Sequence, residues 1–74
     1  MLTLFHTDGC HLCEQAWQLL EEAGLATRTR QCDIMEDASW LERYRVRIPV
    51  LRDDTGRELG WPFTLAELRH WLAA

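Results

Sequence analysis

Cys10 and Cys13, which are separated by two residues, have the clearest capacity for chemistry in this sequence. They follow a short β-prone segment, 2–5, and open a segment whose apolar residues recur with helical spacing. The start of a helix offers unpaired backbone N–H groups and the positive end of the helix dipole, and both favour a thiolate. We therefore expect a lowered pKa for Cys10; a fall from about 8.5 to about 7 raises the thiolate fraction at neutral pH from roughly 3% to about half.

The two cysteines are expected to have different roles. Cys13 lies one turn inside the helix, receives less help from the helix start, and should remain a thiol. The Cys10 thiolate would attack a substrate disulfide, and Cys13 would then displace the reduced product in an intramolecular step. His11 lies between them, and its imidazolium would stabilise the thiolate, whereas Asp8 would oppose this. The spacing thus predicts dithiol–disulfide exchange with Cys10 as attacking thiol and Cys13 as resolving thiol.

Two other interpretations of the cysteine pair are open: coincidental packing, and metal binding. Soft ligands are available at His6, Cys10, His11 and Cys13. A structural zinc site usually closes with a second, distant pair of ligands, however, and only Cys32 and His70 are left over. We therefore expect no bound metal, and we expect Cys32 to behave as a small hydrophobic residue.

Length and composition limit the class of protein. The 74 residues form one domain, 1–74, and 47% hydrophobic content with four Trp indicates a globular chain with a small core. The net charge of −4 argues against nucleic acid as the main partner, because phosphate binding needs a basic surface. All eight basic residues are Arg, which removes lysine Schiff-base chemistry from consideration.

The sequence also suggests a compartment. The first residues lack the basic and apolar regions of a signal peptide, and no apolar run approaches the roughly 20 residues that cross a bilayer. We expect a cytoplasmic monomer that does not associate with membranes. Structural disulfides are rare in the cytoplasm, and three cysteines are an odd number. Both points favour a catalytic or metal-binding role for the cysteine pair.

The elements that position the cysteines follow from local signals. We expect strands over 2–5, 27–33, 48–51 and 57–60, a helix from the cysteines to Gly24, a short helix begun by Asp37, and a last helix after Thr64. Thr64 and Glu67 form a capping-box pattern, and Phe63 and Leu68 a hydrophobic staple. The polar segment 27–33 suits an edge strand.

This order of elements predicts an α/β fold. A strand–helix–strand start implies a parallel pair joined by a right-handed crossover, and the late hairpin adds antiparallel pairing. The predicted architecture is a four-stranded mixed sheet with helices on both faces, in the order β-α-β-α-β-β-α.

Taken together, these features resemble the glutaredoxin-like branch of the thioredoxin superfamily, particularly its short bacterial members. The resemblance rests on three segments: Leu4-Phe5 leading into Cys10-His11-Leu12-Cys13, Cys32-Asp33-Ile34, and Tyr44 through Leu51 with its Ile48-Pro49-Val50. It covers nearly the whole chain and implies a thioredoxin fold. It also implies a thiol–disulfide oxidoreductase of glutaredoxin type that acts on a disulfide-containing protein or a glutathione mixed disulfide.

The resemblance also implies a substrate-binding role for Ile48 and Pro49. In the family the matching proline follows a cis peptide bond and faces the active cysteines. The N–H and C=O of Ile48 would then be free to pair with an extended substrate backbone. Without the resemblance, a trans proline at the start of a strand would be favoured, because only about one X–Pro bond in twenty is cis.

The chain departs from glutaredoxins at three places, one of which is that no lysine precedes the cysteine motif. His11 stands where they have proline, and Gly60-Trp61-Pro62 replaces a Gly-Gly pair before the last helix. Glutathione is still a candidate cosubstrate, with Thr64 at the helix start holding a carboxylate. The further expected substrate-binding residues are His11, Arg47 and Trp61. Arg47 would belong to a positive wall formed with Arg43, Arg45 and Arg52, or simply to a solvated surface.

Two other functions remain open beside the oxidoreductase. The first is a binding or adaptor protein that keeps the fold with weak or no turnover, suggested by the lost glycine pair and the small size. The second is metal or iron–sulfur binding through Cys10, for example across a dimer.

Overall fold

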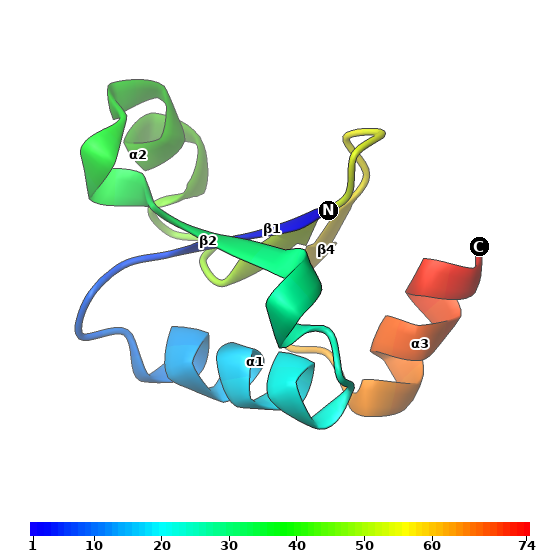
Figure 1. The fold of residues 1–74 in the computed structure, drawn as a ribbon. Coiled ribbons are helices and arrows are strands. Elements are labelled where there is room, and N and C mark those ends of the chain that lie inside the picture. Colours follow the sequence, from blue (N-terminus) through cyan, green and yellow to red (C-terminus); the bar gives the residue numbers. More distant parts are fainter.

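The computed structural model describes all residues, 1–74, and confirms the expected four-stranded mixed sheet with helices on both faces (Figure 1). The strands are β1 (Leu2–His6), β2 (Thr29–Asp33), β3 (Val50–Arg52) and β4 (Glu58–Gly60). The helices are α1 (His11–Glu22), α2 (Ala38–Tyr44) and α3 (Leu65–Ala73), with short 3₁₀ turns at Ala26–Arg28 and Ile34–Glu36.

The sheet has the strand order β2-β1-β3-β4. β1 and β2 run parallel, as the crossover through α1 requires, whereas β3 pairs antiparallel with both β1 and β4. β2 therefore lies at one edge, as its polar sequence predicted. β1 lies in the interior of the sheet and ends four residues before Cys10.

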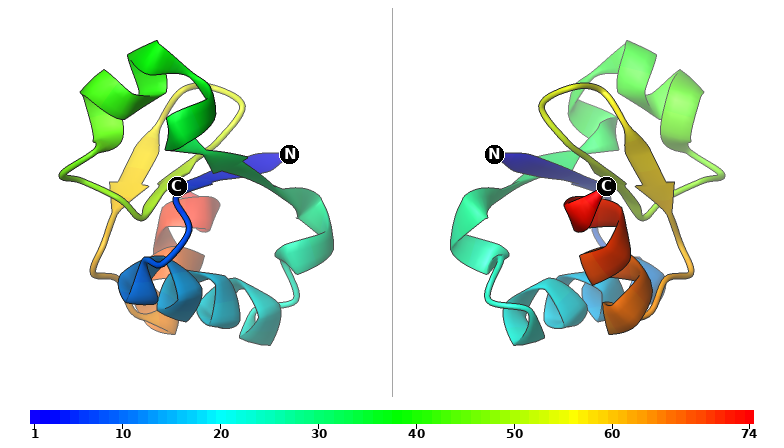
Figure 2. Two further views of the ribbon diagram at one scale, coloured as in Figure 1. Left: turned by 90° about the vertical axis from the view of Figure 1, so that its left-hand side faces the viewer. Right: turned by 90° about the vertical axis from the view of Figure 1, so that its right-hand side faces the viewer.

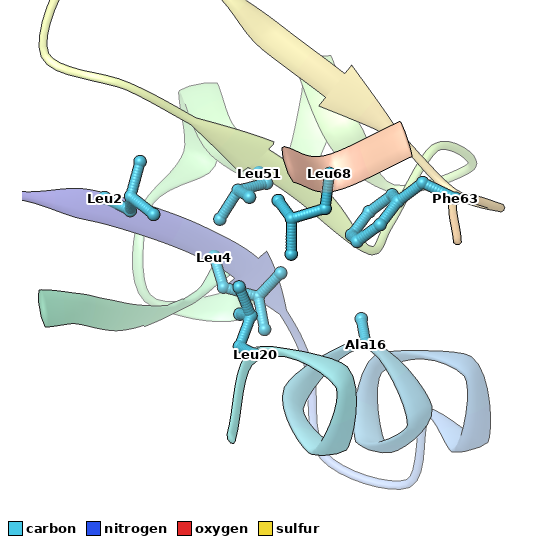
Figure 3. Packing of buried hydrophobic residues seen from close by; sticks show 7 residues of the cluster. All are labelled: Leu2, Leu4, Ala16, Leu20, Leu51, Phe63 and Leu68. Carbon is cyan, nitrogen blue, oxygen red and sulfur yellow. The ribbon is translucent and has the colours of Figure 1, made fainter. Parts of the chain in front are cut away.

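One face of the sheet is covered by α1 and α3. Seven buried residues form the core on this side, and Figure 3 shows them converging between the strands and the two helices: Leu2, Leu4, Ala16, Leu20, Leu51, Phe63 and Leu68. Ala16 and Leu20 lie one turn apart on α1 and are fully buried. This packing fixes the rotation of α1 about its axis and hence the direction in which its first turn projects.

The opposite face carries α2, and Figure 2 shows α2 on the other side of the sheet from α1 and α3. A smaller core forms here from Phe5, Ile34, Tyr44 and Val50. The Phe5 and Tyr44 rings stack with their centroids 4.3 Å apart, and Trp40 meets Phe5 edge-on. Because side chains alternate along a strand, consecutive residues of β1, Leu4 and Phe5, enter the two different cores.

The helix boundaries follow the predicted caps. The backbone of Gly24 has a φ of +73°, the left-handed conformation that commonly ends a helix and that glycine adopts without strain. Asp37 caps α2 by accepting hydrogen bonds from the N–H groups of Ser39 and Trp40. Thr64 and Glu67 make both hydrogen bonds of the capping box at α3. All three termini confirm local sequence signals.

Three strands begin later in the structure than the sequence predicts. β2 begins at residue 29 because Ala26–Arg28 form a 3₁₀ turn, and β4 begins at residue 58. β3 begins at residue 50 because the N–H groups of Arg47 and Ile48 both donate to the carbonyl of Tyr44, which extends the end of α2. None of the helices combines the length and apolar character needed to cross a membrane.

Candidate active site

Cys10 is the N-cap of α1. Its backbone is extended, with φ −92° and ψ 102°, and its Sγ atom accepts a hydrogen bond from the backbone N–H of Cys13 at 3.2 Å. The sulfur therefore occupies the position in which a serine or aspartate oxygen usually caps a helix. Gly9, with φ +76°, turns the chain immediately before it. The predicted placement of Cys10 at the helix start is confirmed.

Cys10 and Cys13 form a disulfide, with their Cα atoms 5.2 Å apart. The two residues differ in accessibility, since Cys10 is partly exposed and Cys13 is only 4% exposed. Cys13 lies on the inner side of α1, close to the core, whereas Cys10 lies at the surface. An incoming reactant can therefore reach Cys10 more easily than Cys13.

The loop between β1 and α1 is fastened to the end of β2. The hydroxyl of Thr7 donates to Asp33 Oδ1 at 3.0 Å. Asp33 also accepts a hydrogen bond from the N–H of Met35 at 2.9 Å, and this bond, more than the one from Thr7, lowers the pKa of the Asp33 carboxyl. One hydrogen bond thus connects the loop before Cys10 to the end of β2, the strand next to β1.

His11 lies on the solvated surface of α1. Its side chain is 91% exposed, and its Nδ1 atom lies 3.7 Å from the carboxylate of Glu14, one turn along α1. His11 is therefore next to the disulfide in the chain but belongs to the solvated surface of the helix.

A cavity of about 390 Å³ lies beside the disulfide and has both Cys10 and Cys13 in its wall. Its floor is formed by Leu4 and Gln31, which are paired across β1 and β2. The rest of the wall comes from the loop before α1 and from the side of α1 that faces the β2 edge. Three carboxylates line the cavity, those of Asp8, Glu14 and Glu21, and no arginine does. None of the expected substrate-binding residues lines it.

The segment around Pro49 differs from expectation at one hydrogen bond. The Ile48–Pro49 peptide bond is cis, as is Trp61–Pro62. The N–H of Ile48 is not free, because it donates to the carbonyl of Tyr44 at 3.0 Å. The expectation that both backbone groups of Ile48 are available is therefore wrong for the N–H. The carbonyl of Ile48 accepts no hydrogen bond within the protein.

Arg47 is held by Glu58 of β4. The guanidinium Nη2 lies 2.9 Å from Glu58 Oε1, and the hydroxyl of Tyr44 donates to Glu58 Oε2 at 2.5 Å. Burial and the hydrogen bond to Glu58 raise the pKa of Tyr44. Burial acts to raise the pKa of Glu58, but the hydrogen bonds from Tyr44 and Arg47 outweigh it and lower that pKa. Arg47 thus belongs to a structural network beside the Pro49 segment.

Trp61 and Thr64 are also engaged in packing and capping. The Trp61 side chain is half-buried against the core on the α1 side and meets Phe63 edge-on, with ring centroids 5.1 Å apart. The backbone N–H of Trp61 donates to the Pro49 carbonyl at 3.2 Å. The Thr64 hydroxyl accepts from the N–H of Glu67, and Glu67 Oε1 accepts from the N–H of Thr64 at 3.2 Å. The carboxylate of Glu67 therefore occupies the start of α3, where a glutathione carboxylate was expected.

Cys32 and the candidate metal ligands form no arranged metal site. Cys32 is a free thiol on β2 that is partly buried against the smaller core, consistent with its expected hydrophobic role. No group of three or more His, Cys, Asp or Glu side chains is arranged to hold a metal ion.

Neither the cavity nor the Glu58 network was predicted from the sequence. A signal for the cavity was present, because Glu14, Gln18 and Glu21 lie 4, 8 and 11 residues after Cys10 and thus share one side of a helix. The pairing of Tyr44 with Glu58 joins residues 14 apart on different elements and has no local signal.

The arrangement of sheet, helices and helix-capping cysteine is that of a thioredoxin-like fold. A family model described as "Glutaredoxin-like domain (DUF836)" matches residues 1–73. The chain therefore belongs to this glutaredoxin-like family, as the sequence resemblance suggested.

Solved structures of a bacterial relative support the fold. The X-ray structure of the structural genomics target protein XcR50 from X. campestris is 48% identical, with a TM-score of 0.91, over 100% of this chain and 99% of that one. The solution structure of XcR50 is 47% identical, with a TM-score of 0.86, over 99% of this chain and 94% of that one. The comparison with curated proteins found no match.

Proposed function

We propose that the protein is a thiol–disulfide oxidoreductase of glutaredoxin type, with Cys10 as the attacking thiol and Cys13 as the resolving thiol. One observation carries the proposal: Cys10 Sγ caps α1 and accepts the N–H of Cys13. This hydrogen bond and the helix dipole both stabilise negative charge on sulfur. The same position therefore favours the thiolate in the reduced protein and the departure of Cys10 as a leaving group in the oxidised one.

The exchange begins with the reduced protein. The Cys10 thiolate attacks one sulfur of a substrate disulfide, a bond forms between Cys10 and that sulfur, and the second substrate sulfur leaves as a thiolate. Cys10 is suited to this step because it is partly exposed, while Cys13 is almost fully buried.

Cys13 completes the reaction. Its thiol loses a proton and attacks Cys10 Sγ, which forms the Cys10–Cys13 disulfide and releases the first substrate sulfur as a thiolate. The substrate has then gained two electrons, and the protein is in the disulfide form that the structure describes. An external thiol donor must restore the dithiol.

The segment before Pro49 is a candidate contact for the substrate backbone. The Ile48 carbonyl lacks a partner within the protein and can accept one hydrogen bond from an extended polypeptide. This contact is half of the one expected from the sequence, because the N–H is already used.

A disulfide-containing protein suits this site better than a glutathione mixed disulfide. Glutathione is an anion, and the start of α3 already holds the carboxylate of Glu67 in its capping box. We further propose that the protein acts as a cytoplasmic monomer without a bound cofactor, and glutathione is retained as a candidate electron donor. The net charge of −4 disfavours nucleic acid as a partner.

The central test is the pKa of the Cys10 thiol. In a Cys13→Ser, Cys32→Ser background, the rate of alkylation by iodoacetamide should follow a single titration with an apparent pKa well below about 8.5, the value of an unperturbed thiol. Replacing the side chain of Cys13 keeps the backbone N–H that bonds to Cys10. The matched control has Cys10 replaced and Cys13 retained, and it should react slowly at neutral pH. An apparent pKa of Cys10 at or above about 8.5 contradicts the proposal.

Turnover assays then separate the oxidoreductase from an adaptor. The reduction of a protein disulfide is followed with glutathione and glutathione reductase, and separately with thioredoxin reductase. Turnover with either donor supports the oxidoreductase. Absence of turnover with both donors, together with an ordinary pKa for the Cys10 thiol, supports a binding role.

A further inference from the structure

The cavity beside the disulfide, here called the acidic cavity, is placed to contact a bound substrate. It is a partly open hollow of about 390 Å³ between α1, the preceding loop and the β1–β2 pair. This volume falls in the usual range of ligand pockets, about 300–1,000 Å³. Both sulfurs border the cavity. A group that enters it is therefore close to any chain joined to Cys10.

The charge of the acidic cavity is uncompensated. The side-chain carboxylates of Asp8 and Glu21 form no hydrogen bond or ion pair in the structure, and the carboxylate of Glu14 has only the exposed His11 at 3.7 Å. His6 is the one basic side chain in the wall, although the protein has eight arginines. Three exposed carboxylates, distributed over the loop before α1 and along one side of α1, repel an anion and attract a cation.

The neutral residues of the wall suit the stem and head of a long cationic side chain. Trp17 is half-buried and offers part of its indole surface. An aromatic face attracts a guanidinium or ammonium group, and an alkyl stem packs on apolar surface while its charged head meets carboxylates. Gln18 and Gln31 add amide oxygens that accept hydrogen bonds from the same head group.

We propose that the acidic cavity binds an arginine or lysine side chain of the substrate polypeptide, a few residues from the cysteine that Cys10 attacks. This inference rests on the proposed function and names the substrate class: protein disulfides flanked by basic residues. The wall of the acidic cavity includes residues of α1 and β2 and none of the Pro49 segment, so this contact is separate from the one proposed for the Ile48 carbonyl.

The test compares three peptides that differ at one position. Each carries a single cysteine as a mixed disulfide with 2-mercaptoethanol, and the residue two positions away is arginine, citrulline or glutamate. Citrulline has nearly the shape of arginine without its charge. We expect kcat/KM to be about two- to fivefold higher for arginine than for citrulline, and lowest for glutamate, because the three carboxylates are exposed and exposed charge pairs are weak.

Matched variants locate the effect. The double variant Asp8→Asn, Glu21→Gln removes two charges from the wall and should reduce the arginine-to-citrulline ratio to about one. The control, Glu36→Gln with Glu42→Gln, changes the net charge by the same amount. Both residues are exposed and lie outside the cavity, and their side chains make no hydrogen bond or ion pair. The ratio should persist in the control.

The outcomes separate the inference from the proposed function. Equal rates for the three peptides, or an equal loss of preference in both double variants, overturn the inference and leave the oxidoreductase intact. If no peptide is reduced, the proposed function fails, and the inference is then decided by calorimetric titration of the oxidised protein with the same peptides carrying serine for cysteine. Tighter binding of the arginine peptide, lost in Asp8→Asn, Glu21→Gln, supports the acidic cavity, and equal binding rejects it.

Discussion

Cys10 caps α1 with its side chain, and in the proposed reaction the same side chain supplies the attacking sulfur. The cap fixes the position of the sulfur over the first turn of α1, because its partner is the N–H of Cys13 and not a mobile side chain. Preorganisation of this kind needs no movement when negative charge develops on sulfur. The nearby charged groups, Asp8 and the exposed His11, are less firmly placed.

The division of roles between the cysteines predicts a trapped intermediate. In Cys13→Ser the attacking thiolate and its capping N–H are kept, but the second displacement cannot occur. A disulfide substrate should therefore remain attached to Cys10, and mass spectrometry should show the protein plus one substrate thiol at nearly full occupancy. In Cys10→Ser, where only the buried Cys13 is left in the motif, no comparable adduct should form. Attachment at Cys32 instead would show that the roles are assigned wrongly.

At the scale of elements, α3 depends on its first turn. The helix has nine residues, which is short for a helix in water without support from capping and packing. The capping box satisfies backbone N–H groups at its start, and Leu68 on its inner side is fully buried in the core shared with α1. The same cap places the Glu67 carboxylate where an anionic ligand would otherwise bind.

Removal of this cap should lower stability measurably. Thr64→Ala loses the hydroxyl that accepts the N–H of Glu67, and such losses typically cost about 0.5–2 kcal/mol. We expect the free energy of unfolding in urea to fall by this amount. Thr27→Ala is the matched control, because Thr27 is exposed and makes no hydrogen bond, and it should change stability by less. Equal stabilities of the two variants would show that α3 is held by packing alone.

At the scale of the whole molecule, Glu58 joins α2 to the far edge of the sheet. Its two carboxylate oxygens accept hydrogen bonds from the hydroxyl of Tyr44 and the guanidinium of Arg47. One carboxylate therefore connects the end of α2 and the segment before Pro49 to β4. Glu58→Gln should lower the free energy of unfolding by about 1–2 kcal/mol at pH 7, since hydrogen bonds to charged groups are stronger than neutral ones. Glu42→Gln, on the exposed side of α2, is the control.

The pH dependence of this difference has a definite sign. The pKa of Glu58 is lowered in the folded protein from its ordinary value of 4.5, so the folded state favours the ionised form. The stabilisation is complete above pH 4.5 and is lost as the pH falls through the lower, folded pKa. Urea unfolding of both proteins between pH 7 and pH 3 should therefore show the wild type and Glu58→Gln converging at acid pH. A constant difference would mean that Glu58 acts through its shape and not its charge.

Sequence reasoning succeeded where the interacting groups are close in the chain. Caps at Cys10, Asp37 and Thr64 each involve partners two or three residues away, and the structure confirms all three. It failed where the partners are distant. Thr7 meets Asp33 across 26 residues, and the cavity floor joins Leu4 to Gln31 through a strand register that no local pattern specifies. The early start predicted for the strand at 48 has a different, local origin, because the backbone N–H of Ile48 donates to the carbonyl of Tyr44 only four residues earlier.

The two free edges of the sheet restrict how another chain can approach. β4 is three residues long, and β2 carries the exposed side chains of Arg30 and Gln31. Short or charged borders discourage the lateral joining of one sheet to a second, which is a common route to fibrils. At high concentration, collisions between molecules along these borders should thus be unproductive.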